Sequence, residues 1–412
     1  MELADKPHRP GWAAFTRDWM FPDTHATRDP RLDLMRGLVF VLLFVVHFDY
    51  FSIFMYVAWE RIGVVSSAET FIALAGIVTG LVFGRKLKAE GLHACIPGLV
   101  GRAVDLYKIN LLVILSLGLL RYVHWINVTA LTTFYDPYSG VTYPLYPPLD
   151  AGLMKLVVDA LLLRCGPHQF QIIGLYACLF LLTPAILYMI GKGRARLLSA
   201  ISCTIYLVNF LMPETTPGTA EIRISGAQFE FAFPLLAWQV LFVHSVIAGY
   251  YKIEIIEFFT RPEQRWWIWL CAAMSLGFMV FSLNHPIDMF PDWAQFNFIP
   301  DDTFNSIFKG YFQKYKLGPG RLLNEVVLFV TVFAVLTRAW RPINKAIGWL
   351  FIPLGEASLY VFMIHIYILL IVINTPLPGL HDFWVDGGIQ AGALLLAWAC
   401  VKKQFLYRWL PH

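Results

Sequence analysis

The feature that most constrains this chain is a series of apolar stretches long enough to cross a lipid bilayer as helices. A spanning helix needs about 20 predominantly apolar residues. Of the 412 residues, 58% are hydrophobic and only 15% are charged, which excludes an ordinary soluble domain. We therefore expect an all-α, polytopic transmembrane bundle with about ten spans. These are predicted at 37–57, 68–84, 103–123, 170–190, 197–212, 234–251, 266–283, 321–338, 354–373 and 388–401.

The basic residues predict how these spans are oriented. The short connections on one side, together with both termini, carry most of the lysines and arginines, as in Lys192, Arg194 and Arg196. The connections on the other side are longer and rich in proline, aromatic residues and aspartate. Cytoplasmic loops carry the excess of basic residues, so both termini are expected in the cytoplasm. The chain then forms a single membrane domain, 1–412, whose first 28 residues are a cytoplasmic segment.

One apolar stretch on the outer side is not expected to be a span. Segment 150–164 is interrupted by Asp150, Lys155, Asp159 and Arg164. Charges at that density are too costly for a lipid-exposed span, so an interfacial or re-entrant helix is predicted.

The composition also limits the classes of ligand. The net charge of +4 is too small to indicate nucleic-acid binding. The six cysteines are scattered without a CxxC pair. Neither a disulfide framework nor a metal site is expected.

The first predicted span carries two ionisable residues on one face. Asp29 can cap the helix, Pro30 suits its first position, and the apolar run extends to about Val57. Arg36 and His47 are eleven residues apart, which places them on one stripe roughly 16 Å apart along the axis. An ionisable side chain at such depth is a functional hypothesis. The alternative is a histidine packed between helices and hydrogen-bonded to a neighbour.

The second predicted span contains a glycine stripe and an acidic start. Gly76, Gly80 and Gly84 repeat every four residues, which predicts close packing against another helix. Glu69 has two interpretations: it favours the helix N-terminus, or it is a partner of His47 or of an acceptor hydroxyl.

Basic residues gather at the predicted inner rim. The positive-inside rule and anionic lipid explain most such clusters. The other interpretation is a phosphate-binding rim for a nucleotide-bearing donor, because arginine pairs with phosphate through two parallel hydrogen bonds. The cluster consists of Arg36, Arg85, Lys86, Lys88 and Arg102. Within the third span, Asp105 and Lys108 are expected to pair with each other.

The ninth predicted span contains a second buried histidine. Ser358 and Tyr360 precede His365 by one to two helical turns. A packed, hydrogen-bonded histidine is the expected role for His365.

Three segments of the chain resemble a known family. The Arg36-to-His47 spacing resembles the R-x10-H signature of integral-membrane acyltransferases of the acyltransferase-3 type. The segments at 28–37, 68–71 and 358–365 look like those of the OpgC family, which adds succinyl groups to osmoregulated periplasmic glucans. The chain departs from that pattern at Gln171, where an acidic residue is often found.

The resemblance implies an O-acyltransferase of the bacterial inner membrane. Its donor would be acyl-CoA from the cytoplasm, succinyl-CoA in the first instance, and its acceptor a periplasmic glucan. His47 and Glu69 are the expected catalytic residues. Histidine can act as a general base or accept the acyl group itself, and both routes stay open.

The remaining site residues are assigned to the two substrates. Donor binding is expected from Arg36, Arg85, Arg102, Lys86 and Lys108. Substrate binding is expected from Arg121, His365, Ser358 and Tyr360. Arg121 is the favoured partner of the donor's free carboxylate, since a buried carboxylate needs a cation.

Two other functions remain open at this point. The nearer one is the same chemistry with an acetyl donor or another envelope glycan. The more distant one is a membrane transporter or flippase, in which His47, Asp105 and Lys108 relay protons or bind a solute. The oligomeric state, including a homo-oligomer, is also open.

Overall fold

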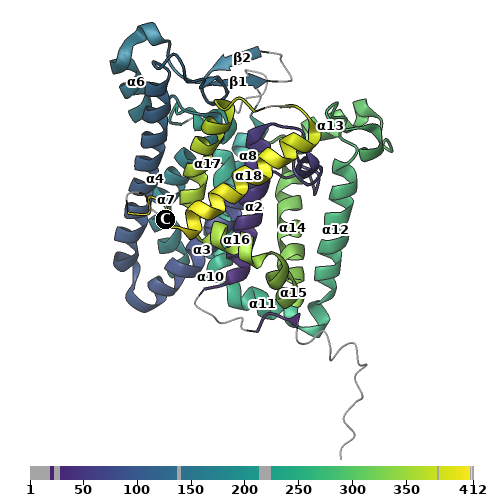
Figure 1. The fold of residues 1–412 in the computed structure, drawn as a ribbon. Coiled ribbons are helices and arrows are strands. Elements are labelled where there is room, and N and C mark those ends of the chain that lie inside the picture. Colours follow the sequence, from purple (N-terminus) through teal and green to yellow (C-terminus); the bar gives the residue numbers. More distant parts are fainter. Residues whose placement is uncertain are drawn as a thin grey trace, which may run out of the picture.

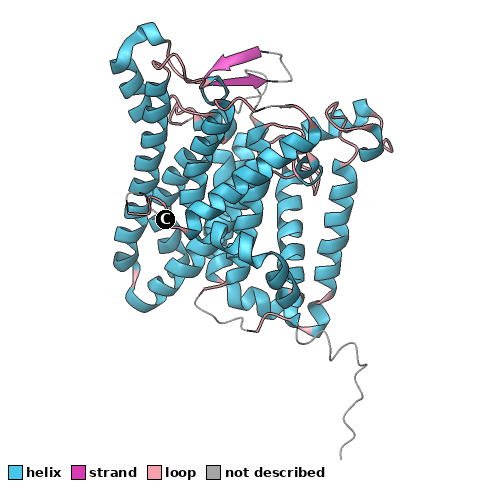
Figure 2. Ribbon diagram, viewed as in Figure 1, coloured by secondary structure: helices cyan, strands magenta, loops and turns pink. Residues whose placement is uncertain are grey.

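Long apolar helices make up most of the molecule, as the computed structural model shows (Figures 1 and 2). The structure describes residues 19–22, 28–136, 141–212, 224–377, 380–408 and 410. Most of the predicted N-terminal segment 1–28 therefore lies outside the described residues. The main helices are α2 (Pro30–Phe48), α3 (Ser67–Glu90), α4 (Leu92–Leu120), α7 (Ile172–Gly191), α8 (Ala195–Leu211), α10 (Leu235–Tyr250), α12 (Trp266–Ser282), α14 (Pro319–Arg338), α16 (Trp349–Glu356), α17 (Ser358–Ile373) and α18 (Phe383–Lys402).

Short elements connect the main helices at the two ends of the bundle. The short helices are α5 (Thr129–Thr132), α6 (Gly152–Leu161), α9 (Phe229–Ala232), α11 (Lys252–Thr260), α13 (Asp301–Tyr311) and α15 (Trp340–Ile343). The strands β1 (Thr133–Asp136) and β2 (Val141–Pro144) form an antiparallel hairpin, which the sequence did not predict. We call the end with α11, α15 and the start of α2 the basal end, and the end with β1, β2, α6 and α13 the hairpin end (Figure 1).

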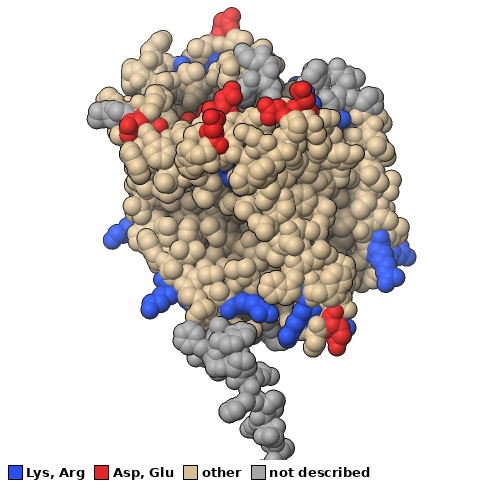
Figure 3. Space-filling view, turned by 90° about the vertical axis from the view of Figure 1, so that its right-hand side faces the viewer, with Lys and Arg blue, Asp and Glu red and all other residues tan. Residues whose placement is uncertain are grey.

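Charged side chains are segregated between these ends. On the face shown in Figure 3, most of the Lys and Arg residues lie towards the basal end and most of the Asp and Glu residues at the hairpin end. A broad band with few charges separates them, as expected of a surface that contacts lipid.

The described helices support a multi-pass membrane protein, but the count of ten spans is not confirmed. Six helices are long and apolar enough to cross a bilayer, and a seventh candidate is the pair Trp340–Glu356 and Ser358–Ile373, which is bent by 91°. The predicted spans at 197–212 and 234–251 form the shorter apolar helices α8 and α10. The hydrophobicity of the sequence indicated where helices form, but it did not indicate which of these helices are long enough to cross a bilayer.

Helix α2 starts as predicted and ends earlier than predicted. The Asp29 carboxylate accepts a hydrogen bond from the Arg31 backbone N–H at 3.1 Å, and Pro30 is the first residue. The helix stops at Phe48 because Asp49 adopts a left-handed conformation with φ of 52°, which Asp tolerates better than most residues. Residues Ile53–Val57 form a separate 3₁₀ turn. The predicted continuation to Val57 is therefore wrong, and His47 lies in the last turn of α2.

Close backbone contacts hold the centre of the bundle together. A Cβ added to Gly80 would collide with the carbonyl oxygen of Val246, and one added to Gly249 with that of Ile77, so α3 and α10 touch along their backbones. This confirms that the predicted glycine stripe serves helix packing. Gly37 and Gly355 do the same for α2 and α16, each facing a backbone carbonyl of the other helix.

The segment at 150–164 contains helix α6, which at 10 residues is too short for a full span. The exposed Lys155 forms an ion pair of 2.8 Å with Asp159, which is buried. The buried Leu156 packs against Gly118 of α4. The segment is therefore a surface helix on the bundle at the hairpin end, as its interrupted apolar pattern indicated.

Candidate active site

Two histidines from different helices meet inside the bundle. His47, in the last turn of α2, lies with its Nδ1 2.9 Å from Nε2 of His365 in the middle of α17. The two rings stack with centroids 5.1 Å apart. His365 is completely buried, whereas His47 is partly exposed. The sequence singled out both residues, but did not indicate that they are partners.

The hydrogen bonds of His365 fix where the protons lie. Its Nδ1 is 2.5 Å from the carbonyl oxygen of Phe362, and a carbonyl can only accept a hydrogen bond. Nδ1 of neutral His365 is therefore the donor, and its Nε2 accepts from Nδ1 of His47. This leaves the lone pair on Nε2 of His47, the less buried ring. His47 is thus arranged as a base, and His365 as the residue that orients it.

A cavity of about 340 Å³ ends at Phe362, one helical turn before His365, and neither histidine lines it. It is lined by α2, α3, α4, α7 and α17, and its walls are largely apolar. Arg36, Arg102, Tyr176 and Ser358 provide polar groups in the lining. Phe362 belongs both to the cavity wall and to the histidine site, since its ring meets that of His365 edge-on at 5.1 Å.

Among the described residues, the two arginines of the cavity have no carboxylate oxygen closer than 3.8 Å. Arg36 is 20% exposed, and its Nη1 is 3.8 Å from Asp33, a carboxylate that Arg28 contacts more tightly at 2.8 Å. Arg102 is also partly exposed in the cavity lining. The structure therefore brings together two of the predicted donor-binding residues, in a cavity that an anionic group could enter.

The other predicted donor-binding residues lie elsewhere. Arg85, Lys86 and Lys108 are not part of the cavity lining. Lys108 is exposed on α4, and the ion pairs of the described residues do not include the expected one with Asp105. Of the predicted set, only Arg36 and Arg102 share a site.

Glu69 belongs to a buried ion network at the hairpin end. One of its oxygens is 2.6 Å from Nε of Arg321, and the other accepts a hydrogen bond from the Ser66 backbone N–H at 3.0 Å. Arg321 also binds Glu60 at 2.6 Å. The capping contact with Ser66 confirms that Glu69 stabilises the start of α3. The hydrogen bonds of Glu69 do not include one to His47.

Two residues near His47 were missed by the sequence reasoning. Lys314, in the turn between α13 and α14, lies close enough to His47, His168 and Glu69 to interact with them electrostatically. His168 precedes α7, and its Nδ1 is buried without a hydrogen-bond partner. The sequence analysis singled out neither residue, because nothing in the pattern placed them near α2. The described residues contain no group of three side chains suited to hold a metal ion.

Three predicted substrate-binding residues have different surroundings. Ser358 lines the cavity. Tyr360 is fully buried, and its ring meets Tyr407 edge-on at 4.8 Å. Arg121 donates a hydrogen bond to the carbonyl oxygen of Pro147 at 2.8 Å and covers the ring of Tyr146. Arg121 therefore anchors the segment that precedes α6.

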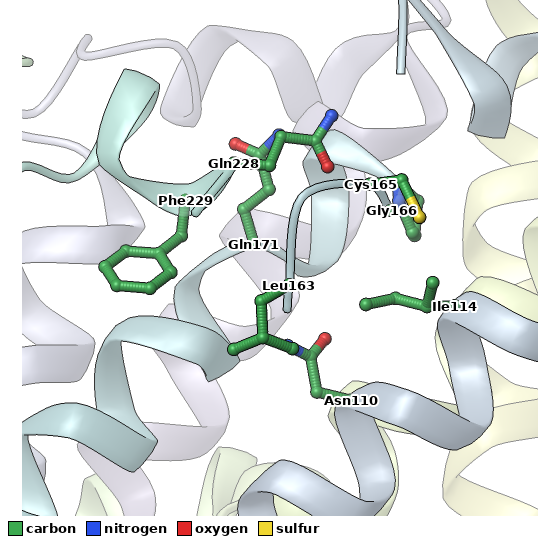
Figure 4. Close-up of a pocket in the computed structure, with 9 residues that line it drawn as sticks. Asn110, Ile114, Leu163, Cys165, Gly166, Gln171, Gln228 and Phe229 are labelled. Carbon is green, nitrogen blue, oxygen red and sulfur yellow. The ribbon is translucent and has the colours of Figure 1, made fainter. Parts of the chain in front are cut away.

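Gln171 lines a second, much smaller cavity of about 10 Å³ (Figure 4). Asn110 of α4 faces Gln171 and Gln228 across it. This space suits roughly one water molecule bound by the amides. Gln171 does not line the cavity that contains Arg36 and Arg102.

Comparison with known proteins identifies the family. The family model described as OpgC protein matches residues 28–409, nearly the whole chain. Neither the curated proteins nor the solved structures contain a match. The match covers α2 and α17, which carry the two histidines, and the helices that enclose the cavity. The chain belongs to the OpgC family.

Proposed function

We propose that this protein is an integral-membrane O-acyltransferase that moves a succinyl group from cytoplasmic acyl-CoA to a hydroxyl of a periplasmic glucan. One observation carries the proposal: a cavity with two weakly paired arginines reaches Phe362, which contacts His365, the partner of a histidine arranged as a base. Membership of the OpgC family supports glucan as the material that is modified.

The donor would lie along the Arg36 face of α2. Arg36 and Arg102 bind its phosphates, and the apolar walls of the cavity accommodate its pantetheine arm. His47 follows Arg36 by eleven positions along the helix, so the arm must extend roughly 16 Å to bring the thioester to the histidine. We assign the basal end to the cytoplasm and the protein to the inner membrane of a bacterium; the basic residues of that end support the assignment of the side.

The reaction follows from the proton assignment. Nε2 of His47 takes the proton of the acceptor hydroxyl as its oxygen attacks the thioester carbonyl. The tetrahedral intermediate collapses with cleavage of the carbon–sulfur bond, and the CoA thiolate receives the proton from His47. His365 holds the His47 ring and, through its bond to Phe362, keeps the reactive lone pair on Nε2. Direct transfer needs no acyl-enzyme.

The ion network at the hairpin end would shape the acceptor side. Glu69 and Arg321 are both fully buried and paired with each other, so we assign Glu69 to positioning rather than to proton transfer. It fixes the start of α3 next to the turn that carries Lys314.

The test is release of CoA by the purified protein in nanodiscs. Succinyl-CoA and acetyl-CoA are supplied in turn, with and without a glucan acceptor, and free thiol is measured. We expect glucan-dependent release, with succinyl-CoA as the better donor. A transporter or flippase releases no CoA from either donor, and that result would overturn the proposal. Faster turnover of acetyl-CoA would instead favour an acetyl donor on the same chemistry.

A further inference from the structure

Lys314 is held in place by three helices. It belongs to the turn 312–318 between α13 and α14. Trp238 of α10 donates a hydrogen bond to the carbonyl oxygen of Tyr315 at 3.3 Å, and Tyr206 of α8 donates to that of Leu317 at 2.9 Å. Arg321 of α14 binds the carbonyl oxygen of Phe312 at 3.2 Å. The backbone around Lys314 is therefore fixed, although the segment is not helical.

The ammonium group of Lys314 is accessible and has no close acidic partner. The ion pairs within 4 Å among the described residues do not include it, and its Nζ lies 5.9 Å from the centroid of the Phe233 ring. The side chain is exposed to solvent. Even so, the surrounding protein lowers its pKa through desolvation, and Glu69 and Glu60 oppose that change. The charge of Lys314 is therefore available to an anionic ligand.

Of the other arginines near the two ends of the site, Arg321 and Arg121 are already engaged, and Arg36 is too distant from His47. Arg321 is saturated by Glu60, Glu69 and the carbonyl of Phe312. Arg121 binds Pro147. Arg36 is eleven helical residues from His47, roughly 16 Å along α2, and is needed at the far end of the cavity. Among the described lysines and arginines, only Lys314 interacts electrostatically with His47.

The donor's own dimensions indicate where a carboxylate-binding group must lie. In an extended succinyl group, three carbon–carbon bonds separate the thioester carbon from the carboxylate carbon by about 4 Å. With the thioester at His47, the binding cation must therefore be a near neighbour of the histidine, but beyond hydrogen-bonding distance of it. A carboxylate that leaves bulk water on binding needs such a partner, because an unpaired buried charge is costly.

We propose that Lys314 binds the free carboxylate of the succinyl donor and thereby sets the preference for succinyl over neutral acyl groups. The inference rests on the proposed acyltransferase function, and it replaces Arg121, the partner favoured from the sequence. Transfer itself remains the task of His47, so Lys314 is a specificity-determining residue.

The experiment compares donors that differ in the carboxylate. CoA release is measured with succinyl-CoA and with butyryl-CoA, which has the same chain length and no charge. In Lys314→Gln we expect kcat/KM for succinyl-CoA to fall by about tenfold or more, the effect of roughly 1.4 kcal/mol. Turnover of butyryl-CoA should stay near that of the wild type, which also shows that the variant is folded. Lys314→Arg should keep most of the preference.

Two controls separate this inference from its alternatives. Lys309→Gln removes an exposed lysine of α13 and should leave both donors unchanged. Arg121→Gln should affect both donors equally. An equal loss for both donors in Lys314→Gln, or no loss, would overturn the role of Lys314 while leaving the acyltransferase intact. Absence of CoA release from any donor by the wild-type protein would overturn the proposed function itself.

Discussion

The two ends of the molecule use arginines in opposite ways. At the hairpin end, Arg321 is completely buried and makes 2.6 Å contacts with both Glu60 and Glu69. Towards the basal end, Arg36 lines a cavity, is partly exposed, and has its nearest carboxylate 3.8 Å away. The first arginine has its charge neutralised by the protein, whereas the second leaves its charge available.

This difference separates a structural charge from a ligand-binding one. Removing one partner of a buried pair leaves an uncompensated charge, so Arg321 and Glu69 are expected to matter mainly for folding. An arginine in a cavity is compensated only when a ligand binds, so Arg36 is expected to matter mainly for the donor. The predictions below test that division.

The largest effect is expected at His47, between the two ends. His47→Ala removes the base and should reduce CoA release by about 10²–10⁴-fold, because general-base catalysis typically contributes that much. Binding of acyl-CoA, measured separately, should be unchanged. His93→Ala, an exposed histidine, is the matched control. Retention of more than about a tenth of the rate would remove His47 from the catalytic role.

The next largest effect is expected in the ion network at the hairpin end, where a substitution should lower the free energy of unfolding. Arg321→Gln leaves Glu69 buried without its partner and should destabilise the protein by about 3–5 kcal/mol. Thermal unfolding in detergent measures this, and the double variant Arg321→Met with Glu69→Leu should recover part of the loss. If Arg321→Gln unfolds like the wild type and instead weakens donor binding, the two ends do not differ as proposed.

At the basal end, the effect should appear in donor affinity. Arg36→Gln and Arg102→Gln should each raise KM for acyl-CoA by roughly tenfold or more, since a hydrogen bond to a charged group contributes about 1.5–3 kcal/mol. Added salt should weaken donor binding in the wild type more than in these variants. The unfolding temperature should not change. An unaltered KM in both variants would mean that these arginines only set the orientation of the protein in the membrane and do not bind the donor.

The smallest effects are expected for the remaining basic residues of the predicted inner rim. Arg85→Gln, Lys86→Gln and Lys108→Gln should leave KM within about twofold, because these residues do not line the cavity and surface charges typically contribute 0–1 kcal/mol. A clear loss of donor affinity in Lys108→Gln would mean that the donor follows another face of α4.

Local patterns were sufficient for much of the fold. The start of α2 at Pro30 and the close packing through Gly80 could be read from a cap, a proline and a four-residue repeat. These features depend on a few neighbouring residues, so a linear pattern contains the necessary information. The end of α2 at Phe48 could not be read in the same way, because the apolar run continues and only the conformation of Asp49 stops the helix.

By itself, the sequence determined that this protein is a helical membrane protein and that Arg36 and His47 share one face of a helix. The family resemblance rested on the same local segments. Only the tertiary structure decided that His365 orients His47, that Arg102 joins Arg36 in one cavity, and that Glu69 pairs with Arg321. The physical reason is that each of these contacts joins helices far apart in the chain. Periodicity within one helix shows which face is polar, but the partner of that face depends on how the helices pack.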